Sequence, residues 1–175
     1  MSEKKTHRVY LSIGSNIGRE GHVGAALDAL EKKFTPLVLS KVYESTSIGF
    51  SGENFYNLVA GIDSSLSVAQ LATIMRSIEQ DNGRRRNGVK FGPRTLDIDI
   101  LTYDDCTGII DGVSLPRDEI LKNAFVLIPL ADVAGEDLHP LCQLSYRELA
   151  DQFDRSQQKL WAVDFIWRGK NISAN

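Results

Sequence analysis

Two aspartates in the stretch LDIDIL at residues 96–101 are the side chains most suited to chemistry. Because side chains alternate along a strand, Asp97 and Asp99 would share one face, roughly 7 Å apart, with apolar neighbours on the other. Aspartate is a poor strand former, so the pair indicates a role beyond the fold. Adjacent negative charges favour a bound cation, and Mg²⁺ commonly takes one or two carboxylates. The alternative is a solvent-facing strand that happens to carry two acidic residues.

A basic segment directly precedes this strand. Positions 84–94 hold five basic residues and no acidic one, namely Arg84, Arg85, Arg86, Lys90 and Arg94. Arginines clamp phosphate oxygens, and a metal ion neutralises the same oxygens from the other side. The two features together predict a phosphate-transfer site, with Arg85 left outside it as a solvated charge. No G-x-x-x-x-G-K-[ST] loop is present and the three histidines are scattered, so a general base would be a carboxylate such as Asp97.

The elements that position these residues follow from hydrophobic periodicity. Strands are predicted at 9–13, 37–44, 55–62 and 95–103, helices at 21–34 and from Ser67 to just before Gly83, and loops at 48–54 and 84–93. The glycine-containing stretch at 14–18 predicts a tight turn from strand to helix, not a dinucleotide fingerprint. The order β-α-β-β-α-β is the split βαβ arrangement, an α+β domain whose antiparallel sheet carries flanking helices, expected on one face.

The second half of the chain gives weaker signals. Residues 118–122 predict a helical turn, and residues 125–130 are uniformly apolar. Ser145 followed by Glu148 is a capping-box pattern that predicts a short helix. Alternating aromatic residues within 154–175 predict an added edge strand.

Bulk properties narrow the class of protein. A chain of 175 residues suits a single domain covering 1–175, and a net charge of −3 argues against a nucleic-acid partner. Cys106 and Cys142 lack metal-ligand spacing, which favours two reduced thiols over a disulfide. The polar N-terminus lacks a signal peptide and no window is apolar enough for a membrane span. We therefore expect a monomer in the cytoplasm.

Several segments, in the same order along the chain, resemble the hydroxymethyldihydropterin pyrophosphokinase family. They are GSN at 14–16, YES at 43–45, FYN at 55–57, IE at 78–79, GRRR at 83–86 and GPRTLDIDI at 92–100. The resemblance covers Val9 to Leu141, leaving 154–175 as a C-terminal extension. It implies a ferredoxin-like fold, which agrees with the element order.

The resemblance also implies a reaction. ATP donates its β- and γ-phosphates as one pyrophosphoryl unit to the hydroxymethyl group of 6-hydroxymethyl-7,8-dihydropterin, in folate biosynthesis, and AMP leaves. Asp97 and Asp99 would hold two Mg²⁺ ions as Lewis acid and template. Arg84 and Arg86 would lie on a loop that closes over the triphosphate, with Arg94 on phosphate. Water exclusion by that loop would strengthen each charge interaction.

The same resemblance assigns the substrate contacts. Phe55 and Phe125 would stack on the two faces of the pterin, Asn57 would read its edge, and Ser45 and Ile48 would be neighbouring contacts. The positions assigned to ATP are Glu79, Arg84, Arg94, Ile100, Ser114 and Arg117.

The sequence departs from the family pattern at four places. Thr46-Ser47 replaces a proline-containing stretch, Arg117 follows Pro116 where the family has histidine, Asn123 stands for an arginine, and Lys90-Phe91 replaces Arg-Trp. The departures on the nucleotide side motivate an alternative, a paralogue that binds a pterin or nucleotide in a different or regulatory role. A single-stranded RNA-binding module is disfavoured, because the strand face is acidic.

Overall fold

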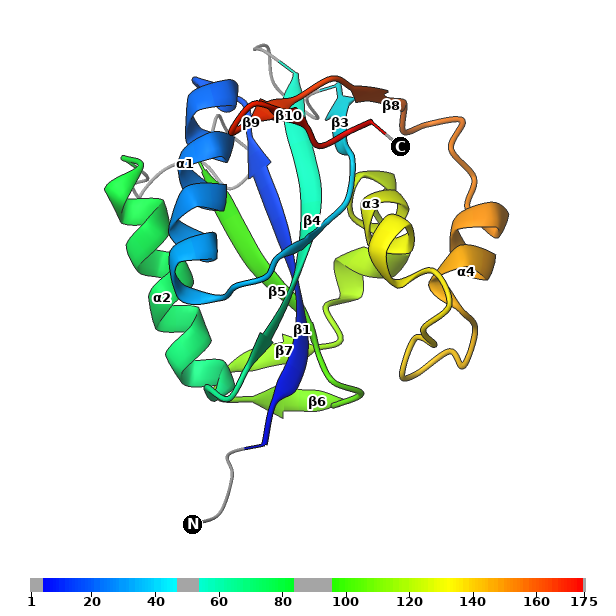
Figure 1. Ribbon diagram of the computed structural model, residues 1–175. Coiled ribbons are helices and arrows are strands. Elements are labelled where there is room, and N and C mark those ends of the chain that lie inside the picture. Colours follow the sequence, from blue (N-terminus) through cyan, green and yellow to red (C-terminus); the bar gives the residue numbers. More distant parts are fainter. Residues whose placement is uncertain (1–4, 47–53, 84–95, 175) are drawn as a thin grey trace.

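The computed structural model describes residues 5–46, 54–83 and 96–174, whose arrangement is shown in Figure 1. The first elements are β1 (His7–Ser15), α1 (Arg19–Lys33), β2 (Val38–Leu39), β3 (Val42–Ser45), β4 (Phe55–Ser64) and α2 (Val68–Asp81). The next are β5 (Asp97–Tyr103), β6 (Gly108–Ile110), β7 (Val113–Leu115), the 3-10 helix η1 (Asp118–Leu121) and α3 (Ala124–Ala134). The last are α4 (Tyr146–Gln152), β8 (Leu160–Val163), β9 (Ile166–Trp167) and β10 (Lys170–Asn171).

The predicted strand at 37–44 is in fact two short strands separated by a bulge. Leu39 pairs with Ala60 and Tyr43 pairs with Asn57, so the 39–43 side carries one residue more than its partner. Ser40 sits at this point, and its buried hydroxyl accepts a hydrogen bond from the Val59 N–H at 2.8 Å. A side chain therefore replaces part of the strand ladder, which period-2 patterning does not reveal.

One six-stranded sheet, in which every pairing is antiparallel, organises the described residues. The order is β5-β1-β4-β3-β8, with β2 also paired to β4. β5, which carries the aspartates, is therefore an edge strand. The predicted edge strand in the C-terminal segment is confirmed as β8, which closes the opposite edge. β6 with β7 and β9 with β10 form two separate hairpins.

Helices cover both faces of the sheet, so the expectation of helices on one face was wrong. In Figure 1, α1 and α2 lie on one side of the sheet, and α3 and α4 lie on the other. Val9, Leu11 and Ile13 of β1 pack with α1 and α2, whereas Tyr10 packs with α3. The uniformly apolar stretch at 125–130 belongs to α3, which can be apolar all round because it is buried between the sheet and its neighbours.

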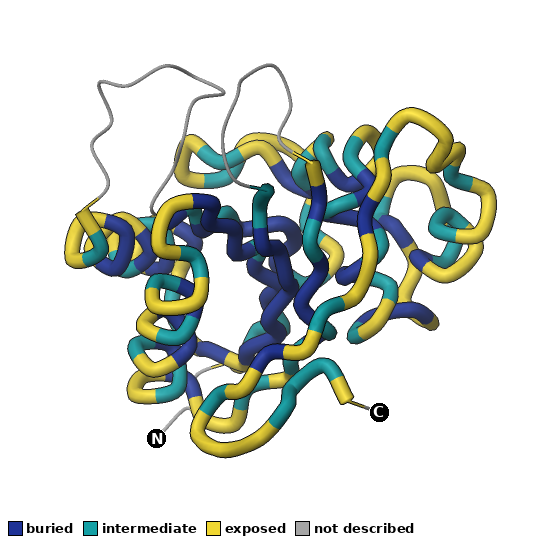
Figure 2. Tube along the Cα trace, turned by 90° about the horizontal axis from the view of Figure 1, so that it is seen from above, coloured by how far each residue is buried: buried dark blue, intermediate teal, exposed yellow. Residues whose placement is uncertain are grey.

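Burial follows this layered arrangement. Figure 2 shows buried residues concentrated along the strands between the helices, with exposed positions on the outward sides of α1 and α2. The helix starts behave as predicted: Ser67 and Ser145 are N-caps that form capping boxes with Gln70 and Glu148. Both cysteines are free. None of the helices in the described ranges combines the length and the apolar character needed to cross a bilayer.

Candidate active site

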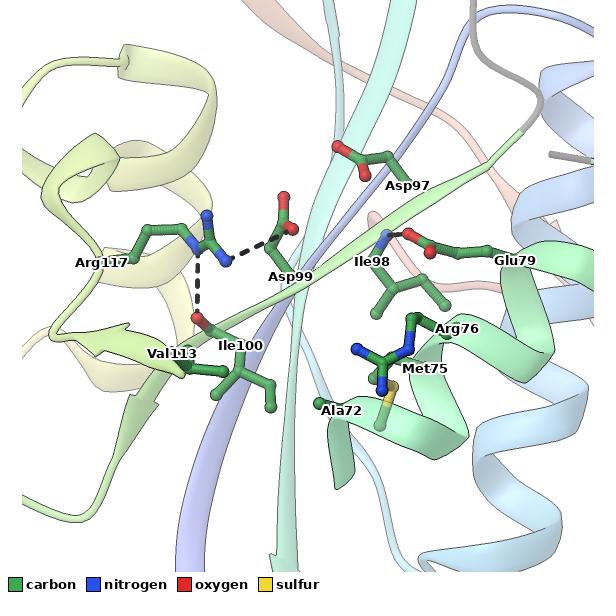
Figure 3. Close-up of a pocket in the computed structure, with 10 residues that line it drawn as sticks. All are labelled: Ala72, Met75, Arg76, Glu79, Asp97, Ile98, Asp99, Ile100, Val113 and Arg117. Carbon is green, nitrogen blue, oxygen red and sulfur yellow. Dashed lines mark hydrogen bonds and ion pairs between the residues drawn. The ribbon is translucent and has the colours of Figure 1, made fainter. Parts of the chain in front are cut away.

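Asp97 and Asp99 project from the same face of β5, as the alternation predicted. Ile98 and Ile100 point to the opposite face, where each is only 4% exposed in the core against α1 and α2. Leu101, two residues beyond Asp99 and so on the same side of β5, packs in the second core cluster with α3. Figure 3 shows the two carboxylates standing out from β5 on one side. The acidic pair therefore lies on the sheet face that α3 partly covers.

The surroundings of Asp99 disfavour its ionised form, which a bound cation would stabilise. Burial, followed by the nearby charge of Asp97, raises the pKa of Asp99 to about 7 from its ordinary value of 3.8, while Arg117 acts to lower it. Two neighbouring carboxylates provide hard oxygen ligands, and Mg²⁺ fits such a pair because it keeps water or phosphate oxygens in its other positions. The pair is the candidate metal site on this chemistry alone; within residues 5–46, 54–83 and 96–174, no group of three or more His, Cys, Asp or Glu side chains gathers.

Arg117 is the cation that the described residues place beside this pair. Its Nη2 lies 3.6 Å from Oδ1 of Asp99, and its Nη1 lies 3.5 Å from Oε1 of Glu119. Its Nε donates to the carbonyl oxygen of Ile100 at 3.3 Å (Figure 3). Because the side chain is 29% exposed, the guanidinium is held at the rim of the site and still reachable by a ligand.

A cavity of about 160 Å³ opens beside the acidic strand and is bounded by α2, β5 and the segment after β6. Its lining consists of Ala72, Met75, Arg76, Glu79, Asp97, Ile98, Asp99, Ile100, Val113 and Arg117 (Figure 3). The structure thus brings together five residues predicted for the metal or ATP. Arg76 was missed, although it lies one helical turn before Glu79 on the face of α2 that sequence spacing puts toward β5.

Glu79 and Ile100, both assigned to ATP, make structural contacts that the sequence did not indicate, whereas Ser114 lies outside the cavity. Glu79 is 2% exposed, and its Oε2 accepts a hydrogen bond from the Ile98 N–H at 2.8 Å, which ties α2 to the edge of β5. Ile100 lines the cavity, and its carbonyl oxygen accepts a hydrogen bond from Nε of Arg117. Ser114 is exposed on β7 and is not among the lining residues, because the alternation of that strand turns Val113 inward instead.

The residues predicted for the pterin gather on the same sheet face as the aspartates. Asn57 is 5% exposed and Ser45 is 6% exposed, and the Asn57 amide donates to the Ser45 hydroxyl at 3.3 Å. Phe55 pairs with Ser45 across β3 and β4. The structure thus brings three of the predicted pterin residues together at one end of the sheet.

Gly14 lies between the two halves of the site. It pairs with Asp97 on one side and with Asn57 on the other, so it separates the metal ligands from the pterin contacts by a single strand. A Cβ atom at Gly14 would lie 2.6 Å from Oδ1 of Asn57, closer than packing permits. The predicted turn is found at residues 16–18, whereas Gly14 belongs to β1. Because glycine has no side chain, the sheet surface between Asp97 and Asn57 is left uncovered at this position.

Phe125 lies on α3, half-buried against the second core cluster, on the side of the sheet that carries the site. Its stacking opposite Phe55 stays a prediction. Asn123, which stands where the family has arginine, is the N-cap of α3, and its carbonyl oxygen accepts from the N–H groups of Val126 and Leu127. Ile48, Arg84, Arg86 and Arg94, with Ser47 and Lys90-Phe91, lie outside the described residues, so their predicted roles also stay predictions.

An antiparallel α+β sheet with an acidic edge strand, a cavity beside it and a buried amide–hydroxyl pair beyond one intervening strand is typical of a ferredoxin-like phosphoryl-transfer class of protein. The family model for 7,8-dihydro-6-hydroxymethylpterin-pyrophosphokinase (HPPK) matches residues 10–135. This chain belongs to the HPPK family.

Curated relatives agree with the family model. The 2-amino-4-hydroxy-6-hydroxymethyldihydropteridine pyrophosphokinase of Pseudomonas aeruginosa is 38% identical over 133 residues, covering 74% of this chain and 82% of that protein. The Aquifex aeolicus protein of the same name is 33% identical over 142 residues, covering 80% of this chain and 88% of that protein. The folic acid synthesis protein fol1 of Pneumocystis carinii is 34% identical over 169 residues, covering 94% of this chain but only 22% of that longer protein.

A solved structure shares the fold. The Plasmodium falciparum HPPK-DHPS triple mutant crystallised with pteroate superposes with a TM-score of 0.68 at 15% identity, covering 86% of this chain and 44% of that chain. The similarity confirms the ferredoxin-like α+β assignment.

Proposed function

We propose that this protein transfers the pyrophosphoryl group of ATP to the hydroxymethyl group of 6-hydroxymethyl-7,8-dihydropterin and releases AMP, a step of folate biosynthesis. The observation that carries the proposal is the alignment of Asp97, Gly14 and Asn57 across three neighbouring strands. A ligand lying over Gly14 would touch the pterin contacts at one end and present its hydroxyl to the acidic pair at the other.

The donor set beside the cavity fits magnesium. Asp97 and Asp99 would hold the metal, for which the family resemblance implies two Mg²⁺ ions. When bound, these ions would supply Lewis acidity and neutralise charge on the phosphates. The carboxylate of Asp97 would take the proton of the attacking hydroxyl group, since no histidine of the described chain lines the cavity.

ATP would enter from the cavity side. Arg76 and Arg117 bring two guanidinium groups to the same cavity as the carboxylates, and both can bind phosphate oxygens. We infer that Glu79 and Ile100 shape the wall against the nucleoside, while Arg84, Arg86 and Arg94 complete the phosphate contacts. On the pterin side, Ser45, Ile48, Phe55 and Phe125 would join Asn57.

The test is the identity of the nucleotide product. Protein, ATP, Mg²⁺ and the dihydropterin are mixed, and products are separated by chromatography beside a reaction without pterin. The proposal expects AMP and the pterin diphosphate in equal amounts, with no AMP in the control. Asp97→Asn should lower turnover at least about a hundredfold while leaving the circular dichroism spectrum unchanged. Production of ADP, or near-normal turnover by Asp97→Asn, contradicts the proposal.

The contact between Arg117 and Asp99 favours one alternative, a paralogue in which this guanidinium permanently neutralises the carboxylate and the site only binds. Calorimetry with the dihydropterin and a non-hydrolysable ATP analogue separates the two. Tight binding of both ligands without AMP release supports the paralogue. Turnover by the unmodified chain excludes it.

The setting of this activity follows from the same proposal. A domain spanning residues 1–175 and acting as a monomer on ATP would work in the cytoplasm, where ATP and reduced pterins meet. Light scattering on the purified chain tests the monomer, with a mass of twice 19.4 kDa as the contrary result.

A further inference from the structure

Arg19 is the first residue of α1, and its side chain contacts the end of β3 and the start of β4 on the sheet face that packs against α1 and α2. Its Nη1 donates to the carbonyl oxygen of Asn54 at 2.9 Å and lies 3.6 Å from Oε1 of Glu44. The centre of its guanidinium lies 4.1 Å from the ring centroid of Tyr56. One side chain therefore contacts a residue of β3, a residue of β4 and the residue just before β4.

The partners of Arg19 are also joined to one another. The side-chain amide of Asn54 donates to Oε2 of Glu44 at 3.0 Å, and Glu44 pairs with Tyr56 across the two strands. Arg19 and Glu44 are 24% and 18% exposed, so their attraction is screened less than that of a pair in full solvent. We call Arg19, Glu44, Asn54 and Tyr56 the Arg19 cluster.

The cluster lies on the opposite face of the sheet from the site. Glu44 and Tyr56 alternate with Ser45 and Phe55, which carry the predicted pterin contacts, and the packing of Tyr56 in the α1 and α2 core fixes which face is which. Arg19 therefore cannot touch a ligand bound over Ser45. It can only act through the backbone of the two strands.

The C-terminal segment also contacts the cluster, at Tyr56. Phe165, 5% exposed, meets the Tyr56 ring edge-on with centroids 6.2 Å apart. The N–H of Phe165 donates to Oδ1 of Asn171 at 3.0 Å, which ties Phe165 to β10 across the open end of the β9–β10 hairpin. β8 pairs with β3 directly at Glu44 and Ser45. Residues 160–172 lie beyond the 10–135 segment that the family model matches.

We propose that Arg19 is a positioning residue for the pterin half of the site, with Phe165 of the C-terminal segment as its support. By tying Glu44 to Asn54, Arg19 sets the spacing of Ser45 and Phe55, which follow them directly in the chain. The inference rests on the proposed function, since it concerns the affinity for pterin.

The experiment uses the full chain and follows each substrate separately. Steady-state assays give KM for pterin, KM for ATP and kcat for Arg19→Gln, Arg19→Lys, Glu44→Gln and the Arg19→Gln/Glu44→Gln double variant. We expect Arg19→Gln to raise KM for pterin about tenfold and to leave KM for ATP within about twofold. Arg19→Lys should recover part of the loss, because it restores the charge but not the planar contact with Tyr56.

Two further variants sharpen the result. The double variant should be scarcely worse than Arg19→Gln alone, because residues in one network are non-additive. Phe165→Leu should raise KM for pterin about threefold in the same direction, since it keeps an apolar side chain but removes the ring edge. Arg147→Gln is the matched control, because Arg147 pairs with Glu136 on the exposed surface and contacts nothing in the site.

The outcomes separate the inference from the proposed function. Unchanged KM for pterin in Arg19→Gln overturns the inference, and so does an equal rise of both KM values with a lower melting temperature, which marks a purely structural role. If the unmodified chain releases no AMP, the proposed function has failed. The role of Arg19 is then tested by calorimetry, in which Arg19→Gln must weaken the affinity for pterin about tenfold. A chain that binds no pterin refutes both.

Discussion

The carboxylate of Glu79 accepts a hydrogen bond from the backbone N–H of Ile98 at 2.8 Å, so a side chain of α2 occupies a position on β5 where a further strand would bind. Both residues are buried, and both line the cavity beside the acidic pair. One contact therefore joins the helix layer, the edge of the sheet and the site.

Replacing Glu79 by alanine should destabilise the fold and weaken nucleotide binding together. The Ile98 N–H would lose this acceptor in a buried position, at a cost of about 1–3 kcal/mol in the free energy of unfolding. Urea denaturation measures the loss, and KM for ATP should rise in parallel. Glu79→Gln keeps an acceptor oxygen and should be milder on both counts. Equal effects from the two variants would show that the hydrogen bond is not the cause.

Adding a methyl group at Gly14 should impair the pterin side without unfolding the protein. The new Cβ would lie 2.6 Å from the Asn57 amide oxygen, so the amide must turn away. We expect KM for pterin to rise at least about tenfold in Gly14→Ala, since a polar contact that recognises the ligand is lost.

Gly24→Ala is the control for that substitution. Gly24 lies in α1, a methyl group added there would meet nothing within 4 Å, and alanine should stabilise the helix by about 0.5–1 kcal/mol. Kinetics for Gly24→Ala should match the unmodified chain. A normal pterin KM in Gly14→Ala would mean that Asn57 does not contact the ligand.

The pH dependence of stability should report on Asp99. Its pKa is raised from 3.8 to about 7, so the folded state holds a proton that the unfolded state has already released. The stability that this group contributes is fully present below about pH 4 and is lost as pH rises through 7. Without metal, the melting temperature should therefore fall between about pH 4 and 7 and level off above that, and Asp99→Asn should flatten this part of the curve.

Magnesium should reverse that trend, because a bound cation stabilises the ionised carboxylates. The melting temperature of the unmodified chain should rise more on adding Mg²⁺ at pH 8 than at pH 5.5, measured against EDTA by scanning fluorimetry. Asp99→Asn should show little response at either pH. A response to Mg²⁺ that is independent of pH would exclude Asp99 as the group involved.

Arg117 should matter for ATP and not for pterin, the converse of Arg19. Its guanidinium contacts Asp99, Glu119 and the Ile100 carbonyl at the rim of the cavity. Arg117→Gln should raise KM for ATP about three- to tenfold, because a charge-assisted phosphate contact is lost. KM for pterin should stay within about twofold. A rise confined to KM for pterin would place Arg117 outside the nucleotide site.

Most features of the fold and the site that could be predicted came from patterns among residues close in sequence. The alternation of Asp97 and Asp99 with buried isoleucines and the caps at Ser67 and Ser145 are local patterns, and the structure confirms them. Contacts between distant segments were not visible. Arg76 joins the cavity only because α2 packs along β5, and Gly14 matters only because β1 lies between Asp97 and Asn57.

The β6–β7 hairpin and α3 were missed for different reasons. The β6–β7 hairpin was missed despite its turn signal, Asp111-Gly112, where both residues adopt positive φ of 52° and 81° and suit a two-residue hairpin. α3 lacked the amphipathic period because it is buried and apolar, and it holds a proline, Pro129, in its interior. The first signal was available in the sequence; the second needed the tertiary context.

The edge of β5 that pairs with no other strand of the described chain has a consequence for solubility. An edge strand with open N–H and C=O groups invites pairing with another molecule, and here Glu79 and Arg117 occupy the groups of Ile98 and Ile100. Glu79 and Arg117, which line the nucleotide cavity, thus also block pairing of β5 with a strand of another molecule. Selection for tighter or altered nucleotide recognition at these two positions would therefore carry a risk of aggregation.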